Sequence, residues 1–270
     1  MRNESTAISP TAGVDLDHIG IAVESVQAPL EEVVGRLGAT VLYGGEAPGC
    51  RFVQTRIGDA ASTGMTVELL EPLGTDPFLG QFLERFGAGA HHLTFRVLDV
   101  IEVVDRFADC GLHPVIRRDL PLWKEAFYSP KDGGGMILQL AESGGPDPAE
   151  AFDAARRDEA LHAEGQRYKG WYPDTPAWWG WPGERGEVEA SLESIVLRVP
   201  DLEKARVVYE RLLEGVPEEE TDEGCTLRWP GGGRLTLVQN STPRGGFDYL
   251  NVSGTPSGPE AIGGARVVFL

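Results

Sequence analysis

Short apolar runs alternate with an amphipathic stretch along the first part of the chain. Residues 17–23 (DHIGIAV) predict a buried strand, and residues 28–37 follow with helical spacing and stop before Gly38. Strand patterns then recur at 39–43, 51–57 and 65–70. This order predicts one β-α-β-β-β unit.

A second unit with the same order follows. Residues 91–97 (HHLTFRV) repeat the pattern of 17–23, and residues 99–110 predict a helix because their apolar pairs line one face. Strands are expected at 113–116, 125–129 and 136–141. The duplication predicts an α+β fold in which tandem βαβββ modules form a curved half-barrel or barrel sheet.

A third, degenerate copy of the unit begins near residue 190. Residues 192–199 predict its opening strand, and Asp201 is a good N-cap for a helix over 202–214. Strand patterns follow at 225–229, 234–239, 249–252 and 265–270. We interpret the last two as the remnant of a fourth module that lacks its helix.

These repeats divide the chain into three expected domains. Residues 14–143 form the paired βαβββ domain, residues 144–188 a Trp-rich helix and linker, and residues 189–270 the degenerate C-terminal βαβββ-like domain. Four of the six tryptophans lie within 171–181, so this segment is expected to bury its rings, either between the two halves or as a lid.

Charge and composition exclude several classes of protein. Asp and Glu number 42 against 24 Lys and Arg, and the net charge of −18 argues against nucleic-acid binding and against an anionic membrane surface. No apolar run is long enough to span a bilayer, and residues 1–13 lack the apolar stretch of a signal peptide. Three scattered cysteines make no disulfide framework, so a cytoplasmic location is expected.

The repeat aligns residues that are suited to metal binding. His18 and His92 occupy the same place in the two opening strands, and Glu68 and Gln139 occupy the same place in the two closing strands. If the two units pair into one curved sheet, these four side chains meet in one cleft. Such nitrogen and oxygen donors suit a divalent cation, so the pattern predicts a metal site.

Strand alternation separates the candidate ligands from their neighbours. Asp17 and His91 directly precede the two histidines, so we expect their side chains on the other face of the sheet. Gln139 and Glu142 are an odd number of residues apart and cannot both point into the cleft from a regular strand. Gln139 is preferred because Glu142 matches Glu71 in the repeat, and Glu142 stays the alternative ligand.

Several motifs together resemble one protein superfamily. They are residues 17–23 (DHIGIAV), 68–72 (ELLEP), 89–95 (GAHHLTF) and 130–135 (PKDGGG). The chain from about residue 14 to 143 resembles the vicinal oxygen chelate superfamily, and within it the glyoxalase and methylmalonyl-CoA epimerase-like proteins.

The resemblance implies a ligand set and a departure from it. His18, Glu68, His92 and Gln139 match the metal ligands of the family. The ion is expected to be divalent Co, Mn, Zn, Ni, Mg or Fe. The family often has a catalytic Glu where this chain has Gln139, and an amide is a poor base. We therefore expect Glu68 or Glu46 to act as the base, since the epimerases carry a glutamate-rich turn near the latter.

The expected function is a metal-dependent epimerase or isomerase. It removes a proton next to a metal-chelated carbonyl of a small keto or sugar-like substrate, with an acyl-CoA as a further substrate class. One alternative is a non-haem Fe(II) dioxygenase on the same scaffold, and another is a non-catalytic binding or resistance protein. Ser194 replaces the histidine in the third copy, so the C-terminal modules are expected to be structural. Single-barrel relatives dimerise, which leaves a homodimer open.

Overall fold

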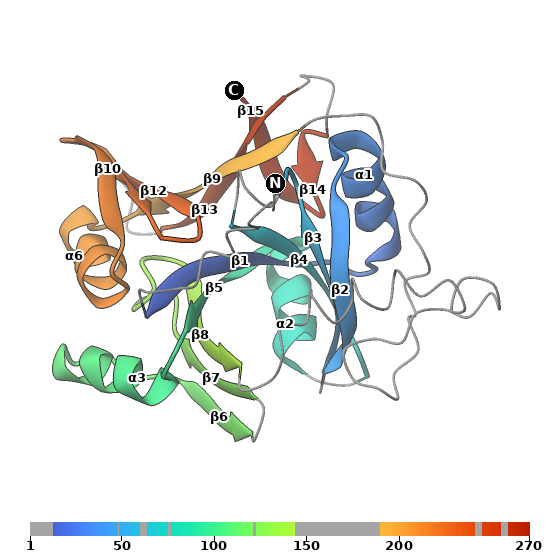
Figure 1. Cartoon of the computed structure of the whole chain (residues 1–270). Helices are drawn as coiled ribbons and strands as arrows, with labels where there is room; N and C mark the ends of the chain where they lie inside the picture. The colour runs from blue at the N-terminus through green and yellow to red at the C-terminus, as the bar shows by residue number, and fades with distance from the viewer. Residues whose placement is uncertain are drawn as a thin grey trace, which may run out of the picture.

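A computed structural model describes residues 13–47, 49–59, 64–74, 77–120, 123–143, 190–240, 245–254 and 259–270. The predicted linker over 144–188, with its tryptophan cluster, lies outside this range. Within the described residues, no helix has the length and hydropathy needed to cross a membrane. Two curved sheets lie side by side, one built by the N-terminal modules and one by the C-terminal modules (Figure 1).

The first sheet contains two modules joined along their opening strands. Each closing strand runs parallel to its own opening strand, and the opening strands β1 and β5 pair antiparallel at the centre. The strand order is β2-β3-β4-β1-β5-β8-β7-β6. This architecture confirms the predicted α+β fold of tandem modules. Its elements are β1 (Val14–Ala22), α1 (Gln27–Leu37), β2 (Thr40–Ala47), β3 (Cys50–Arg56), β4 (Thr66–Pro72), α2 (Pro77–Phe86), β5 (Gly89–Val97), α3 (Val100–Asp109), β6 (Ile116–Leu120), β7 (Trp123–Tyr128) and β8 (Ile137–Ser143).

The second sheet repeats this plan in a reduced form. Its order is β10-β11-β12-β9-β13-β15-β14, and β13 pairs antiparallel with β9 and parallel with β15, as β5 does with β1 and β8. The predicted remnant of a fourth module is therefore confirmed. Its elements are β9 (Ser191–Val199), α6 (Leu202–Arg206), the π-helix η1 (Val207–Leu212), β10 (Val216–Thr221), β11 (Gly224–Arg228), β12 (Arg234–Gln239), β13 (Gly246–Ser253), β14 (Ala261–Ile262) and β15 (Ala265–Phe269).

Several elements differ from the sequence prediction. Helix α2 was not predicted, although its apolar residues have helical spacing and Leu79 packs against Ala22 and Leu70 of the first sheet. No strand was predicted between 214 and 225, but most of the acidic run 218–223 belongs to the exposed edge strand β10. Charged side chains are common on edge strands because they discourage pairing with another chain. Strand β6 lies later than the predicted 113–116.

One continuous apolar core lies between the two sheets. Ile19 of β1 and Phe95 of β5 face it from the first sheet, and Ile195 of β9 and Trp229, just after β11, face it from the second. The rings of Phe95 and Trp229 lie 5.1 Å apart. Since side chains alternate along a strand, this packing leaves the opposite face of β1 to His18.

Glycine turns of each sheet contact the other sheet. The Tyr209 hydroxyl of η1 donates a hydrogen bond of 2.7 Å to the carbonyl of Gly133, in the turn before β8. The backbone N–H of Gly231, in the β11–β12 turn, donates to Asp15 Oδ1 at 3.2 Å. Gly135 has φ +108°, and a Cβ there would overlap the backbone of Gly245. These glycines therefore serve the packing of the two sheets.

We expect the bond from Tyr209 to stabilise the association of the sheets. Replacing Tyr209 by Phe leaves the buried Gly133 carbonyl without this donor and should lower the free energy of unfolding by about 1 kcal/mol. Tyr128 is equally buried, but its hydroxyl has no hydrogen-bond partner among the described residues. Tyr128→Phe should therefore cause no loss. Urea unfolding checks both, and equal losses would contradict the assignment.

Candidate metal centre

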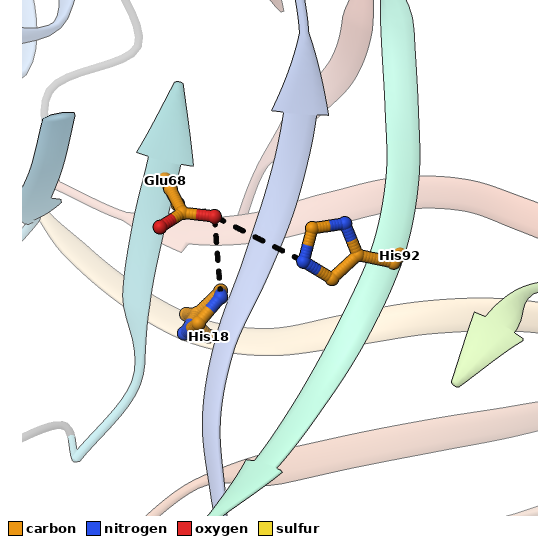
Figure 2. Close-up of side chains that lie close together, drawn as sticks. All are labelled: His18, Glu68 and His92. Carbon is orange, nitrogen blue, oxygen red and sulfur yellow. Dashed lines mark ion pairs between the residues drawn. The ribbon is translucent and has the colours of Figure 1, made fainter. Parts of the chain in front are cut away.

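Three of the predicted ligands meet on adjacent strands of the first sheet. His18 comes from β1, Glu68 from β4 and His92 from β5, and their side chains point toward one another (Figure 2). Glu68 Oε2 lies 3.4 Å from His18 Nε2 and 3.9 Å from His92 Nε2. One ligand atom of each residue lies within 4.8 Å of those of the others, and all three side chains are buried.

Gln139, the fourth predicted ligand, lies beside this cluster on β8. Its Oε1 accepts a hydrogen bond of 2.6 Å from the Thr94 hydroxyl, which lies 2.8 Å from His18 Nε2. The Gln139 side chain is buried, with 6% of the residue exposed. Its amide oxygen is therefore linked to the cluster through the Thr94 hydroxyl.

The side chain of the alternative ligand Glu142 lies at the start of α3 and outside the ligand cluster. It accepts the backbone N–H of Val100 at the start of α3, at 2.9 Å, and pairs with a lysine. Glu71 does the same in the first module, where it accepts the N–H of Val26 and pairs with an arginine. The predicted equivalence of Glu71 and Glu142 is thus confirmed, and both carboxylates bind the N-terminal ends of helices.

Glu46, the second candidate base, is not brought to the cluster. It forms an ion pair of 2.9 Å with Arg51, which also pairs with Glu71. These three residues lie opposite one another across β2, β3 and β4. Because Glu71 and Glu68 are an odd number apart on β4, Glu46 lies on the other face of the sheet. The sequence suggested a turn at this position, but β2 extends to Ala47.

Bulges on the two opening strands bring Asp17 and His91 against the histidines. The β1–β5 register shifts once at each residue, so each is an extra residue in its strand. Asp17 Oδ2 lies 2.8 Å from His18 Nδ1, and His91 Nδ1 lies 3.0 Å from His92 Nδ1. Neither residue belongs to the ligand cluster, but the alternation expected of a regular strand, which kept both side chains away from the histidines, does not hold at these bulges. They leave both Nε2 atoms directed toward Glu68.

The buried charges set the protonation of the cluster. Burial opposes the charged form of His18, but Glu68 and the hydrogen bond with Asp17 outweigh it and raise the pKa of His18 to about 10. Burial, followed by the nearby His91 and His18, holds the pKa of His92 well below its usual value. Burial also lowers the pKa of His91 to about 4. The metal-free cluster therefore holds a positive charge on His18, which an incoming cation would replace.

Sequence reasoning missed a second layer of polar residues. Gln54 of β3 donates to Glu68 Oε1 at 3.4 Å and lies 3.3 Å from His18 Nδ1, and the Thr66 hydroxyl donates to Gln54 Oε1. Gln54 lies directly opposite Glu68 in the β3–β4 hairpin. Gln54 could have been predicted from the sequence, because it is a polar residue in a hairpin strand that pairs with the strand of a candidate ligand.

Aromatic rings close the site beside His92. Phe78 of α2 packs edge-on against His91 with ring centroids 4.9 Å apart, and Phe127 of β7 lies 6.1 Å from the His92 ring. Gly20 lies opposite His92 in the β1–β5 ladder. A Cβ at this glycine would overlap the His92 ring, so the glycine provides the space that the ring fills.

Comparisons with known proteins identify the superfamily of the chain. The sequence model of the glyoxalase/bleomycin resistance protein/dioxygenase superfamily matches residues 17–124. The uncharacterized protein YqjC of Bacillus subtilis is 32% identical over 133 residues, which cover 48% of this chain and 93% of that protein. The chain belongs to this superfamily.

Two further relatives extend the comparison. The ethylmalonyl-CoA/methylmalonyl-CoA epimerase of Cereibacter sphaeroides is 27% identical over 134 residues, covering 47% of this chain and 96% of that protein. A hypothetical protein from Staphylococcus aureus has a solved structure with a TM-score of 0.56 and 10% identity, and it covers 95% of this chain and 99% of its own. This likeness concerns the fold alone, and it spans both sheets of the present chain.

We expect Gly20 to be required for the placement of His92. Gly20→Ala should displace the His92 ring, shift its NMR signals and lower the free energy of unfolding by about 1–3 kcal/mol. Gly35, on the exposed face of α1, is the control, because a Cβ there meets no atom within 4 Å. Gly35→Ala should stabilise the protein by up to about 1 kcal/mol. An unshifted His92 ring in Gly20→Ala would contradict this role.

Proposed function

We propose that this member of the superfamily is a divalent-metal-dependent epimerase or isomerase of a small carbonyl compound. The observation that carries the proposal is the buried cluster of two imidazoles and one carboxylate on three adjacent strands. Such a cluster does not arise to stabilise a fold, because burying charged groups costs free energy unless a ligand or partner offsets it.

The cluster fits a divalent ion. His18, Glu68 and His92 would hold the ion, with Gln139 as a fourth ligand through Oε1. Imidazole nitrogens with oxygen donors suit several ions, including Zn, Co, Ni, Mn, Mg and Fe. Ligand histidines usually have a partner on the nitrogen that does not bind the metal, and here Asp17 provides one for His18. When bound, the ion stabilises negative charge on a substrate oxygen beside the reacting carbon.

Glu68 is the carboxylate best placed to move the proton. It lies within the cluster, only 8% exposed, whereas Glu46 points to the opposite face of the sheet. Gln139 offers an amide at the equivalent position of the second module and cannot take a proton at neutral pH. Glu68 therefore serves as ligand and base in this proposal, and Gln54 orients it by donating to Oε1.

The surroundings favour a compact substrate. Phe127 places apolar surface next to His92, and Phe78 packs against its neighbour His91. This apolar surface suits the carbon skeleton of a ketone or sugar-like compound. Three described arginines of the first sheet, Arg51, Arg96 and Arg118, each pair with a carboxylate. These pairings do not favour the phosphates of an acyl-CoA as their partners. The likeness to an acyl-CoA epimerase supports that substrate class as the alternative.

A non-haem Fe(II) dioxygenase is the second candidate. Two histidines and one carboxylate with open positions are the ligand set of such enzymes, and the cluster has this composition. The two candidates share the metal site and differ in the reaction, so an exchange assay and an oxygen assay separate them.

Metal content tests the site itself. Purified protein should contain about one divalent ion per chain, measured by inductively coupled plasma mass spectrometry, and His92→Ala should lose it because one of the three ligands is removed. Circular dichroism of the variant controls for folding. If the wild-type protein takes up no ion even after reconstitution, the chelate mechanism fails and a binding or resistance protein becomes the better interpretation.

Solvent exchange tests the reaction. In D₂O the metal-loaded protein should introduce deuterium next to the carbonyl of a small ketone. Glu68→Gln keeps an oxygen ligand but removes the base, so the exchange rate should fall by about 10²-fold or more. Glu46→Gln, on the far face of the sheet, should leave the rate unchanged. Oxygen consumption with Fe(II), without exchange, would instead support the dioxygenase.

A further inference from the structure

A buried carboxylate lies directly behind Gln139. Glu125 of β7 is 5% exposed and accepts three hydrogen bonds. Gln139 Nε2 and Trp123 Nε1 donate to its Oε2 at 2.7 and 2.9 Å, and Arg118 Nη1 donates to its Oε1 at 2.7 Å. Glu125 is outside the ligand cluster, so the proposed metal site does not by itself explain this buried charge.

We propose that Glu125 is a positioning residue that sets the orientation of the Gln139 amide toward the metal site. This inference rests on the proposed function, since it concerns the fourth ligand of the same ion. An amide has a donor end and an acceptor end that differ little in shape. A carboxylate can only accept, so the NH₂ group of Gln139 faces Glu125 and the oxygen faces Thr94 and the cluster.

The reversed orientation is unfavourable at both ends. It would place the amide oxygen of Gln139 against the oxygen of Glu125, and two acceptors without a proton between them repel each other. It would also direct an NH₂ group at the position where a cation binds. Burial strengthens both effects, because water does not reach these groups to replace the lost hydrogen bonds.

The hydrogen bonds form one chain that ends at Glu125. His18 Nε2 lies 2.8 Å from the Thr94 hydroxyl, this hydroxyl donates to Gln139 Oε1 at 2.6 Å, and Gln139 donates to Glu125 at 2.7 Å. The chain links the first module to the second across the β1–β5 seam. It also places the carboxylate of Glu125 directly behind the neutral amide of Gln139. Gln139 occupies in the second module the position that Glu68 occupies in the first.

Glu125 is a poor candidate for the catalytic base itself. Both of its oxygens already accept hydrogen bonds, and the Gln139 side chain lies between it and the cluster. Its effect on the metal would therefore pass through Gln139. Partners that orient metal ligands in this way typically change metal affinity by 10–100-fold when removed.

Three variants test the orientation. Glu125→Met keeps the bulk of the side chain without an acceptor, and Co²⁺ affinity, measured by competition with a chelator, should fall at least tenfold. Arg118→Met removes a half-exposed donor on the far side of Glu125 and should change the affinity less than twofold. Glu125→Met combined with Gln139→Glu should restore the affinity to within about threefold of wild type, because a carboxylate has no NH₂ group to misplace.

A loss of Co²⁺ affinity that Gln139→Glu does not rescue, or no loss of affinity in Glu125→Met, would overturn the inference.

A second measurement uses the metal-free protein. The side-chain NH₂ signals of Gln139, identified by their absence in Gln139→Glu, should exchange slowly with solvent in the wild type and in Arg118→Met, and rapidly in Glu125→Met. If wild-type protein binds no Co²⁺, the proposed function fails, and these signals still decide whether Glu125 orients the amide.

Discussion

The antiparallel pairing of β1 with β5 is the constraint on which the site depends. It joins the two modules at their opening strands and places His18 and His92 on the same face, two ladder positions apart. The parallel partners β4 and β8 then bring Glu68 and Gln139 to either side of this seam. Because each module supplies half of the polar groups, neither half of the first sheet can form the cluster alone.

Two bulges in the β1–β5 ladder add contacts to the two histidines. Each adds one residue directly before a histidine, and the added side chain contacts the Nδ1 atom. The β9–β13 ladder of the second sheet has bulges too, between Leu192 and Ser194 and between Phe247 and Tyr249. The first sheet pairs His18 with Thr94 at the position where the second sheet pairs Ser194 with Asn251. Ser194 accepts a hydrogen bond from Asn251 there. Both sheets thus share the same strand pairing with its bulges, and among the described residues the candidate ligands lie in the first sheet.

The packing of the sheets explains why the polar face stays available. Both sheets turn their continuous apolar faces toward a shared core, with Phe95 and Trp229 in contact at its centre. On the opposite face of the first sheet, α2 packs Leu79 over Ala22 and Leu70. Buried charge on that face is tolerated because Glu68, Gln139 and Glu125 each have hydrogen-bond partners.

The sequence by itself determined the modules, their order and three residues of the cluster. Apolar spacing repeats locally, and two copies of one pattern must fold alike, so His18 and His92 could be paired without coordinates. Tertiary structure alone decided the contacts of Asp17 and His91, the face occupied by Glu46 and the partnership of Glu125 with Gln139. A local pattern specifies an element and its faces, whereas bulges, strand limits and contacts between strands depend on how distant segments pack.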